Sequence, residues 1–198
     1  VIGSGVDGAL VCLREMDALG AIERKGGHDN IIRFMGAYTE SSSSSPTYLI
    51  VLELAQTDLL QLTEQSSSLQ NETNLWKVAL AVARALKFLH GLGVAHRDVK
   101  PENILVVASG EVKLADFGLS VMVPNGCRLY ERCGTPQYMA PEVISGVGYN
   151  SLVDVWSFGV MMFLMFYRRL PFGDGMLGQP MSMMKEILSL PAPKIDGE

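Results

Sequence analysis

Apolar residues recur every three or four positions along one central stretch of the chain. The stretch runs from Leu75 to Leu92, and Gly91 and Gly93 mark its end. Side chains with this spacing share one face of a helix, so the stretch predicts an amphipathic helix. A similar period over roughly Cys12 to Lys25 predicts another helix, which Gly26-Gly27 terminates.

A further segment is apolar on almost all sides. Residues 152–168 predict a helix buried in the protein core, and residues 181–190 predict a short helix after it. The longest apolar run, from Val155 to Phe166, lies inside the first of these. A membrane span needs about 20 apolar residues, so this run is too short for one and we expect no membrane partner.

Short runs rich in β-branched and aromatic residues predict strands. The expected strands are 31–38, 48–54, 104–107 and 112–115, and a hairpin turn at Ser109-Gly110 joins the last two.

The remaining segments predict turns and loops. Residues 1–13 predict a strand and a glycine turn that runs into the first helix. Polar, serine-rich segments at 41–45 and 64–73 predict exposed loops. The run 41–45 is either a tolerated insertion in a hairpin loop or a cluster of phosphorylation sites.

The composition is typical of a globular intracellular protein. Of 198 residues, 48% are hydrophobic and 19% are charged, which suffices for a packed core in one large domain or two small lobes. The net charge of −5 argues against a nucleic-acid partner, which would require a basic surface. The three cysteines are odd in number and lack metal-ligand spacing. We therefore expect free thiols in a reducing compartment, cytoplasmic or nuclear. The chain begins with Val1 and no signal-peptide pattern follows, so we expect a fragment or a trimmed chain.

Three short motifs carry candidate chemistry for phosphoryl transfer. In chain order they are His96-Arg97-Asp98-Val99-Lys100-Pro101-Glu102-Asn103, Asp116-Phe117-Gly118 and Ala140-Pro141-Glu142. Phosphoryl transfer needs hard oxygen ligands for a metal, cations against the phosphate and a carboxylate beside the nucleophile. Asp98 can accept the hydroxyl proton, and Lys100 can contact the transferring phosphate. Asn103 and Asp116 can hold Mg²⁺.

With these motifs the chain resembles the eukaryotic protein kinases, from about residue 15 to about residue 190. Lys100, two residues after the catalytic Asp, and the segment CGTPQYMAPE at 133–142 are typical of the serine/threonine branch. The pattern Tyr149-Asn150 followed by residues 154–157 is most similar to the calmodulin-dependent kinase group.

The resemblance implies an α+β fold of the two-lobed protein kinase type. A shortened, β-rich N-lobe would comprise residues 1–54, and a mainly helical C-lobe without its last helices would comprise residues 55–198. The hinge between them would lie at Glu53-Leu54-Ala55. The implied reaction transfers the γ-phosphoryl group of ATP, with Mg²⁺, to Ser or Thr hydroxyls of proteins. Asp58 and Glu102 stand where relatives meet an Arg upstream of the phosphorylated residue.

The resemblance also assigns individual contacts in the site. ATP contacts would come from Gly3, Gly5, Gly8, Glu53, Ala55, Asp58 and Leu105. Thr135 would bond to Asp98 and Lys100 as a third catalytic residue, or else be an ordinary turn threonine. Arg97 would meet an anion at position 131, where many relatives carry a phosphothreonine and this chain has Glu131. The alternative is that Glu131 is a solvated surface residue.

A buried column of side chains is implied as well. Its members would be Leu19, Phe34, His96 and Phe117, anchored by Asp154. Plain core packing describes each of them equally well.

The chain departs from the family pattern near its start. Relatives place two strands between the glycine loop and the first helix, and the second strand carries a lysine that grips ATP and pairs with a helix Glu. Glu15 fits the helix Glu, but only six residues separate Gly8 from Glu15 and no lysine precedes Lys25. The Arg that pairs with Glu142 in relatives would also lie beyond this chain. These departures indicate missing segments, from a gene-prediction error, a spliced form or a fragment.

Two classes of function therefore remain open. The first is an active protein serine/threonine kinase, and the second is a catalytically impaired pseudokinase that acts as a scaffold or allosteric partner. A dinucleotide-binding oxidoreductase would rest on the glycine run alone and lacks the strand–helix–strand unit that such a site requires.

Overall fold

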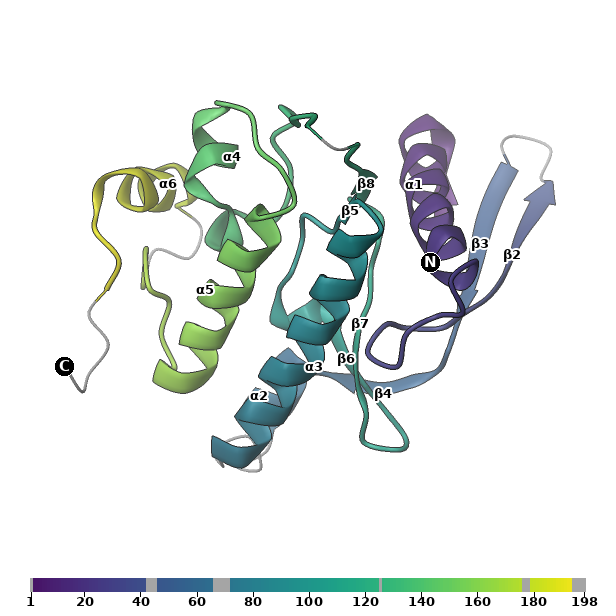
Figure 1. The fold of residues 1–198 in the computed structure, drawn as a ribbon, viewed down its shortest axis with the longest axis horizontal. Helices are drawn as coiled ribbons and strands as arrows, with labels where there is room; N and C mark the ends of the chain where they lie inside the picture. Colours follow the sequence, from purple (N-terminus) through teal and green to yellow (C-terminus); the bar gives the residue numbers. More distant parts are fainter. Residues whose placement is uncertain (1, 42–45, 66–71, 125, 176–178, 194–198) are drawn as a thin grey trace.

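A computed structural model of the chain describes residues 2–41, 46–65, 72–124, 126–175 and 179–193. Three small antiparallel sheets and a set of helices make up this part of the chain (Figure 1). This mixture agrees with the α+β class that the sequence predicts. Within these ranges no helix is both long and apolar enough to cross a membrane.

The first sheet packs against the first helix. Strands β1 (Ile2–Ser4), β2 (Phe34–Ser41) and β3 (Pro46–Leu52) pair in the order β1-β3-β2. Helix α1 (Gly5–Glu23) lies beside β3 (Figure 1). It buries one stripe, from Cys12 through Glu15 and Leu19 to Ile22, because side chains three and four positions apart share a helix face.

The start of α1 corrects the sequence prediction. The helix begins at Gly5, not near Cys12, so Gly5 and Gly8 lie in its first turns and Gly3 lies in β1. The expected glycine turn is wrong for these residues. The expected glycine-rich loop would join two strands, but in the structure helix α1 follows β1 directly.

The second sheet follows the predicted hinge. Strands β4 (Ala55–Asp58), β6 (Ile104–Val107) and β7 (Val112–Leu114) pair in the order β4-β6-β7. The β6–β7 hairpin was predicted, and its turn uses Gly110 in the left-handed region, with φ +84°. The short elements β4 and α2 (Leu59–Gln65) were not predicted. Of the predicted loop at 64–73, residues 66–71 lie outside the described ranges, as do residues 42–45 of the serine run.

The long helices confirm the apolar periodicity. They are α3 (Glu72–Gly91), α5 (Val153–Tyr167) and α6 (Pro180–Ser189). Figure 1 shows α3 and α5 side by side, with α6 beyond the short helix α4 (Pro141–Ser145). Strands β5 (Val94–Ala95) and β8 (Val121–Met122) form the third sheet next to the end of α3.

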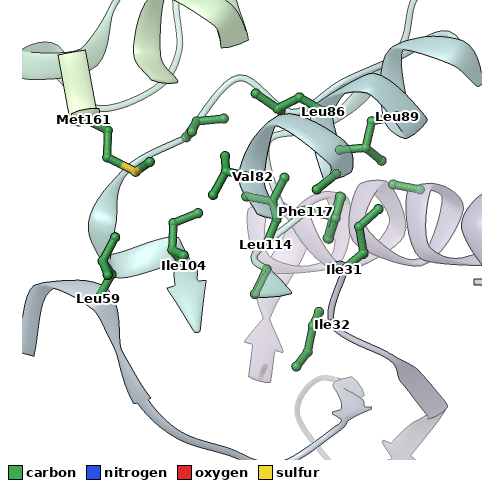
Figure 2. Close-up of a cluster of buried hydrophobic side chains, with 14 of the residues drawn as sticks. Ile31, Ile32, Leu59, Val82, Leu86, Leu89, Ile104, Leu114, Phe117 and Met161 are labelled. Carbon is green, nitrogen blue, oxygen red and sulfur yellow. The ribbon is translucent and has the colours of Figure 1, made fainter. Parts of the chain in front are cut away.

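A hydrophobic core joins α1, α3 and α5 to the first two sheets (Figure 2), whereas α4 and α6 pack in smaller clusters around Val143 and Met183. Leu86 and Leu89 of α3 meet Phe117, Leu114 of β7 and Ile31 in this core. The loops after β5 and β7 therefore emerge from a rigid base, and these loops carry the residues with candidate chemistry.

Candidate active site

Asp98, Lys100 and Thr135 form a closed triangle of polar contacts. The Lys100 Nζ lies 2.8 Å from Asp98 Oδ2 and donates a 2.8 Å hydrogen bond to Thr135 Oγ1. The Thr135 hydroxyl donates to Asp98 Oδ1 at 2.7 Å, and its backbone N–H donates to the same oxygen at 3.0 Å. The structure therefore brings together the three residues predicted as catalytic.

This triangle keeps Asp98 ionised. Burial alone would raise the pKa of the carboxyl, but hydrogen bonds from Lys100 and Thr135 lower the pKa below its ordinary value. Asp98 is thus a carboxylate at neutral pH, which is the form that can accept a proton.

Asn103 and Asp116 supply oxygens suited to a metal. The Asn103 Nδ2 donates to Asp98 O at 2.8 Å and to Asp98 Oδ2 at 3.1 Å, which leaves the amide oxygen for a ligand. Asp116 is exposed, and its Oδ1 accepts a 3.3 Å hydrogen bond from the Gly118 N–H. The backbone bond from Ala115 N to Asn103 O, at 2.9 Å, joins the two segments. This hard donor pair fits Mg²⁺.

No group of three or more His, Cys, Asp or Glu side chains that could hold a metal occurs in the described part of the chain. Magnesium commonly takes only one or two protein carboxylates and completes its shell with water and substrate phosphates. Asn103 and Asp116 would therefore be sufficient protein ligands for a magnesium ion that arrives with a phosphate ligand.

Two site residues hold a left-handed backbone. The φ angles are 69° for Arg97 and 61° for Asp116, a conformation that costs a non-glycine residue about 1–3 kcal/mol. The fully buried carboxylate of Asp154 in α5 holds the first of them. It accepts hydrogen bonds from Arg97 N at 2.7 Å, His96 N at 2.9 Å and His90 Nε2 at 2.8 Å. The anchoring role predicted for Asp154 agrees with these contacts.

Glu131 is held by two arginines from distant parts of the chain. The Arg97 Nη1 lies 3.0 Å from Glu131 Oε2, and Arg14 of α1 lies 3.2 Å from the same oxygen. A second bond, from Arg14 Nη1 to Glu131 Oε1, measures 3.3 Å. Burial would raise the pKa of Glu131, but the hydrogen bonds and charges of both arginines lower it. Glu131 is therefore paired and is not a freely solvated residue.

Glu15 lacks a partner of this kind. Its side chain is fully buried, and neither carboxylate oxygen has a hydrogen-bond partner within the described residues. Burial and the charge of Asp116 raise the pKa of Glu15 to about 6, against a smaller opposing effect of the Phe117 backbone. Within the described residues, no cationic side chain hydrogen-bonds to the Glu15 carboxylate.

Comparison with known proteins decides the family. The family model described as "Protein kinase domain" matches residues 9–194. The chain belongs to the protein kinase family.

Curated relatives are serine/threonine kinases of several kinds. The cAMP-dependent protein kinase catalytic subunit of Arthrobotrys oligospora is 35% identical over 161 residues, which cover 81% of this chain and 30% of the relative. CBL-interacting serine/threonine-protein kinase 7 of Arabidopsis thaliana is 38% identical over 177 residues, covering 87% of this chain and 39% of the relative. An "Aurora kinase" of Dictyostelium discoideum is 38% identical over 145 residues, covering 73% of this chain and 36% of the relative. The chain thus spans well under half the length of these relatives, and their variety does not confirm a place in the calmodulin-dependent group.

Side chains of the predicted buried column contact one another in part. The rings of His96 and Phe117 meet edge-to-face with centroids 5.0 Å apart, and His96 Nε2 donates to Ala115 O at 3.0 Å. Leu19 is fully buried in the same core, and Phe34 packs against that core.

The predicted nucleotide contacts of the chain are spread over β1, α1, β4 and β6, and Glu53 lies just before β4. Ala55 and Asp58 lie in β4, where Asp58 pairs in register with Leu105 of β6. The Asp58 carboxylate accepts Gln61 N at 2.9 Å and so caps the start of α2. Glu53 bonds Arg33 N at 3.3 Å and Lys113 Nζ at 3.4 Å. Gly3, Gly5 and Gly8 lie in β1 and α1, and their contact with phosphates stays a prediction.

The contact of Arg14 with Glu131 was not predicted from the sequence. Arg14 lies 117 positions from Glu131, and no local pattern relates the two.

Proposed function

We propose that this kinase chain transfers the γ-phosphoryl group of ATP to Ser or Thr hydroxyls of proteins. The observation that carries the proposal is the triangle of Asp98, Lys100 and Thr135 beside Asn103 and Asp116. It combines a proton acceptor, a cation and two metal ligands, which are the groups that phosphoryl transfer requires.

Each residue has a separate task in this reaction. Bound MgATP supplies the phosphoryl group and a cation against its charge. Asp98 orients the substrate hydroxyl and accepts its proton, which its lowered pKa permits at neutral pH. Lys100 holds one oxygen of that carboxylate and faces the transferred group, and Thr135 fixes the other oxygen. Asn103 and Asp116 would hold the metal.

Glu131 supports the activation segment, here residues 126–142, in an ordered arrangement that does not need phosphorylation. The Glu131 carboxylate occupies the position between Arg14 and Arg97 that a phosphate could fill. The same segment also contacts the catalytic loop, residues 96–103. The Thr135 N–H, four residues after Glu131, donates to Asp98 Oδ1 at 3.0 Å. The proposed enzyme would thus need no upstream kinase to position Thr135.

The substrates we propose are intracellular proteins with an Arg before the phosphorylated residue. Glu102 is exposed beside Asp98 and Lys100 in the sequence and could meet that Arg. Asp58 is less suited to this role, because its carboxylate already caps α2. The free thiols of Cys12, Cys127 and Cys133 agree with a reducing compartment.

A pseudokinase scaffold is the second candidate. The observation in its favour is Glu15, whose carboxylate has no cationic partner among the described residues. Efficient ATP binding in the family relies on a lysine at that place, so its loss would weaken catalysis and leave the fold for binding alone.

Phosphotransfer to synthetic peptides tests the proposal. Purified chain, radiolabelled ATP and Mg²⁺ are incubated with a Ser peptide that carries an upstream Arg, and with matched peptides in which Ala replaces the Ser or the Arg. We expect label on the Ser peptide, less label without the Arg, and a loss of about a hundredfold or more in Asp98→Asn. Label transfer that Asp98→Asn leaves unchanged would overturn the proposal, as would folded protein that transfers none.

A further inference from the structure

Helix α5 is apolar on almost all sides, but the described residues cover only one side of it. Its single charged residue, Asp154, is fully buried against the catalytic loop. On the outer side, Val155, Phe166 and the preceding Leu152 are exposed. A helix that is apolar all round is normally buried, and an exposed apolar patch often marks an interaction site. The outer face of α5 is therefore a candidate interaction surface.

An open apolar groove lies on this outer face. Its volume is about 560 Å³, and its walls come from α5, from the segment after α5 and from the residues that follow α6. A Cβ added at Gly159 would meet no atom outside the helix backbone within 4 Å, so the groove is open above this point of the helix. The apolar side chains of the groove include Leu152, Val155, Trp156, Phe163 and Phe172.

One carboxylate also lines the groove. Glu142 of α4 is half-buried there. Its side chain makes none of the ion pairs or hydrogen bonds found among the described residues. The groove thus combines an apolar surface with an unpaired negative charge, which favours a partner that presents apolar side chains together with a cation.

Helix α6 of the same chain presents these groups on its exposed face. Met183 and Ile187 are buried in a small core with α4, whereas Met181, Lys185 and Leu188 point outward and are exposed. Residues three and four positions apart share a helix face, so the exposed face carries a lysine between two apolar side chains. In the part of the chain that the structure describes, the Lys185 ammonium belongs to no ion pair.

The groove and α6 lie at the same end of the molecule. Helices α4 and α6 pack against each other there, and Ala192 and Pro193 of the groove follow α6 closely in the chain (Figure 1). A two-fold axis at this end can therefore place α6 of each copy against the groove of the other, with the same patch used on both copies.

We propose that two copies of this chain form a symmetric dimer, in which α6 of each copy lies in the α5 groove of the other and Lys185 faces the partner's Glu142. Burial of the apolar side chains supplies the affinity, and the charge pair fixes the orientation. The inference goes beyond the proposed function. Dimer formation is measured without nucleotide or peptide substrate, so it can fail while phosphotransfer succeeds, and the reverse.

Sedimentation velocity of the purified chain over a range of concentrations is the test. We expect wild type to show a monomer–dimer equilibrium. Lys185→Glu should dimerise about tenfold more weakly or worse, because it places a second carboxylate opposite the partner's Glu142. The matched control is Lys87→Glu, which makes the same charge change at an exposed lysine of α3 and should dimerise as wild type does. Wild type that stays monomeric up to about 100 µM would overturn the proposal, as would an equal loss in both variants.

A mixture of two single variants shows whether the charge pair joins two copies. Glu142→Lys should dimerise weakly, as Lys185→Glu does, because like charges meet in each homodimer. An equimolar mixture of the two should recover the wild-type affinity to within about threefold, because every pair between the two chains then joins opposite charges. Variants that stay as weakly associated in the mixture as they are alone would overturn the proposal.

Two leucine variants keep the test decisive if Glu142→Lys fails to fold. Leu188 and Leu80 are similarly exposed, by 51% and 52%, but Leu188 lies on the proposed interface and Leu80 lies on α3. Leu188→Asp should weaken the dimer about tenfold or more, because it places a charge in the apolar groove, and Leu80→Asp should not. Equal dimer affinities for the two variants would contradict the proposed interface.

Discussion

Gly134 lies where the activation segment crosses the catalytic loop. Its φ is +100°, and a Cβ added there would lie 2.6 Å from the backbone oxygen of Arg97. Neither backbone can move freely, because Thr135 binds Asp98 on one side and Asp154 holds Arg97 on the other. At the residue scale, the two backbones can therefore cross here because Gly134 has no Cβ.

Gly134→Ala should therefore destabilise the protein by about 2–4 kcal/mol, from backbone strain and the clash together. The control is Gly110→Ala, which has φ +84° but no atom within 4 Å of the added Cβ. That change should cost only about 1 kcal/mol. Urea denaturation measures both values, and equal losses would show that the contact with Arg97 does not matter.

Glu15 gives the stability of the metal-free protein a specific pH dependence. The pKa is about 6 in the folded protein, against an ordinary value of 4.5. Between these values the folded state binds more protons than the unfolded state, so stability falls as pH rises through the window. The loss amounts to about 2 kcal/mol and persists above pH 6.

The measurement is urea denaturation from pH 4.5 to 7.5 in EDTA. Wild type should lose stability relative to Glu15→Gln across that range, and the two should converge at its acidic end. Parallel profiles for the two proteins would contradict the raised pKa.

At the element scale, α1 is tied to the activation segment by the Arg14–Glu131 pair. The same Glu131 binds Arg97 of the catalytic loop, so one carboxylate links three elements that are far apart in sequence. The Arg14 side chain is about a quarter exposed and Glu131 about half, with values of 27% and 49%. Solvent therefore screens this link, and its energy is modest.

A double-mutant cycle with Arg14→Gln and Glu131→Gln should give a coupling free energy of about 0.5–1 kcal/mol that shrinks at high salt. Trypsin should cleave the activation segment several-fold faster in either variant, because Arg128 and Arg132 flank the segment's Tyr130. Arg24→Gln, at an exposed arginine directly after the same helix, is the control and should leave cleavage unchanged. A coupling free energy of zero would show that the Arg14–Glu131 pair does not hold α1 to the activation segment.

Helix α5 supports the catalytic loop through the buried carboxylate of Asp154. Asp154→Asn keeps the shape of the side chain but removes the charge that three hydrogen bonds reach, from His90, His96 and Arg97. We expect a loss of about 3 kcal/mol in urea denaturation. Asp174→Asn, whose contact with Leu170 N measures 3.3 Å at an exposed site, should lose under about 0.5 kcal/mol. Similar losses for the two variants would mean that Asp154 does not anchor the catalytic loop.

At the scale of the whole molecule, the chain follows its sequence wherever the signal is local. The apolar period predicted α3 and α5, and the resemblance to protein kinases predicted that Thr135 bonds to Asp98 and Lys100. Contacts between residues far apart in the sequence could not be predicted in the same way. Strand β4 is four residues long and exists because it pairs with β6, about 50 positions later. Arg14 and Glu131 meet only after α1 packs beside the activation segment, so no local rule could relate them.

At the start of the chain, a local sequence signal was present but predicted the wrong structure. Glycines at 3, 5 and 8 suggested a turn, but the helix continues through Gly5 and Gly8 because α1 gains its stability from packing on the first sheet. Local glycine preference was thus overridden by tertiary contacts. The sequence has no lysine before Lys25, and the described residues give the Glu15 oxygens no hydrogen-bond partner.

The central claim is that this kinase chain binds MgATP without the strand-borne lysine. Thermal unfolding with and without MgATP tests it most directly, with Asp116→Ala as the control. The account predicts a rise in Tm that requires Mg²⁺ and disappears in Asp116→Ala. A folded wild type whose Tm is unchanged by MgATP would contradict the claim and leave the chain a kinase by descent only.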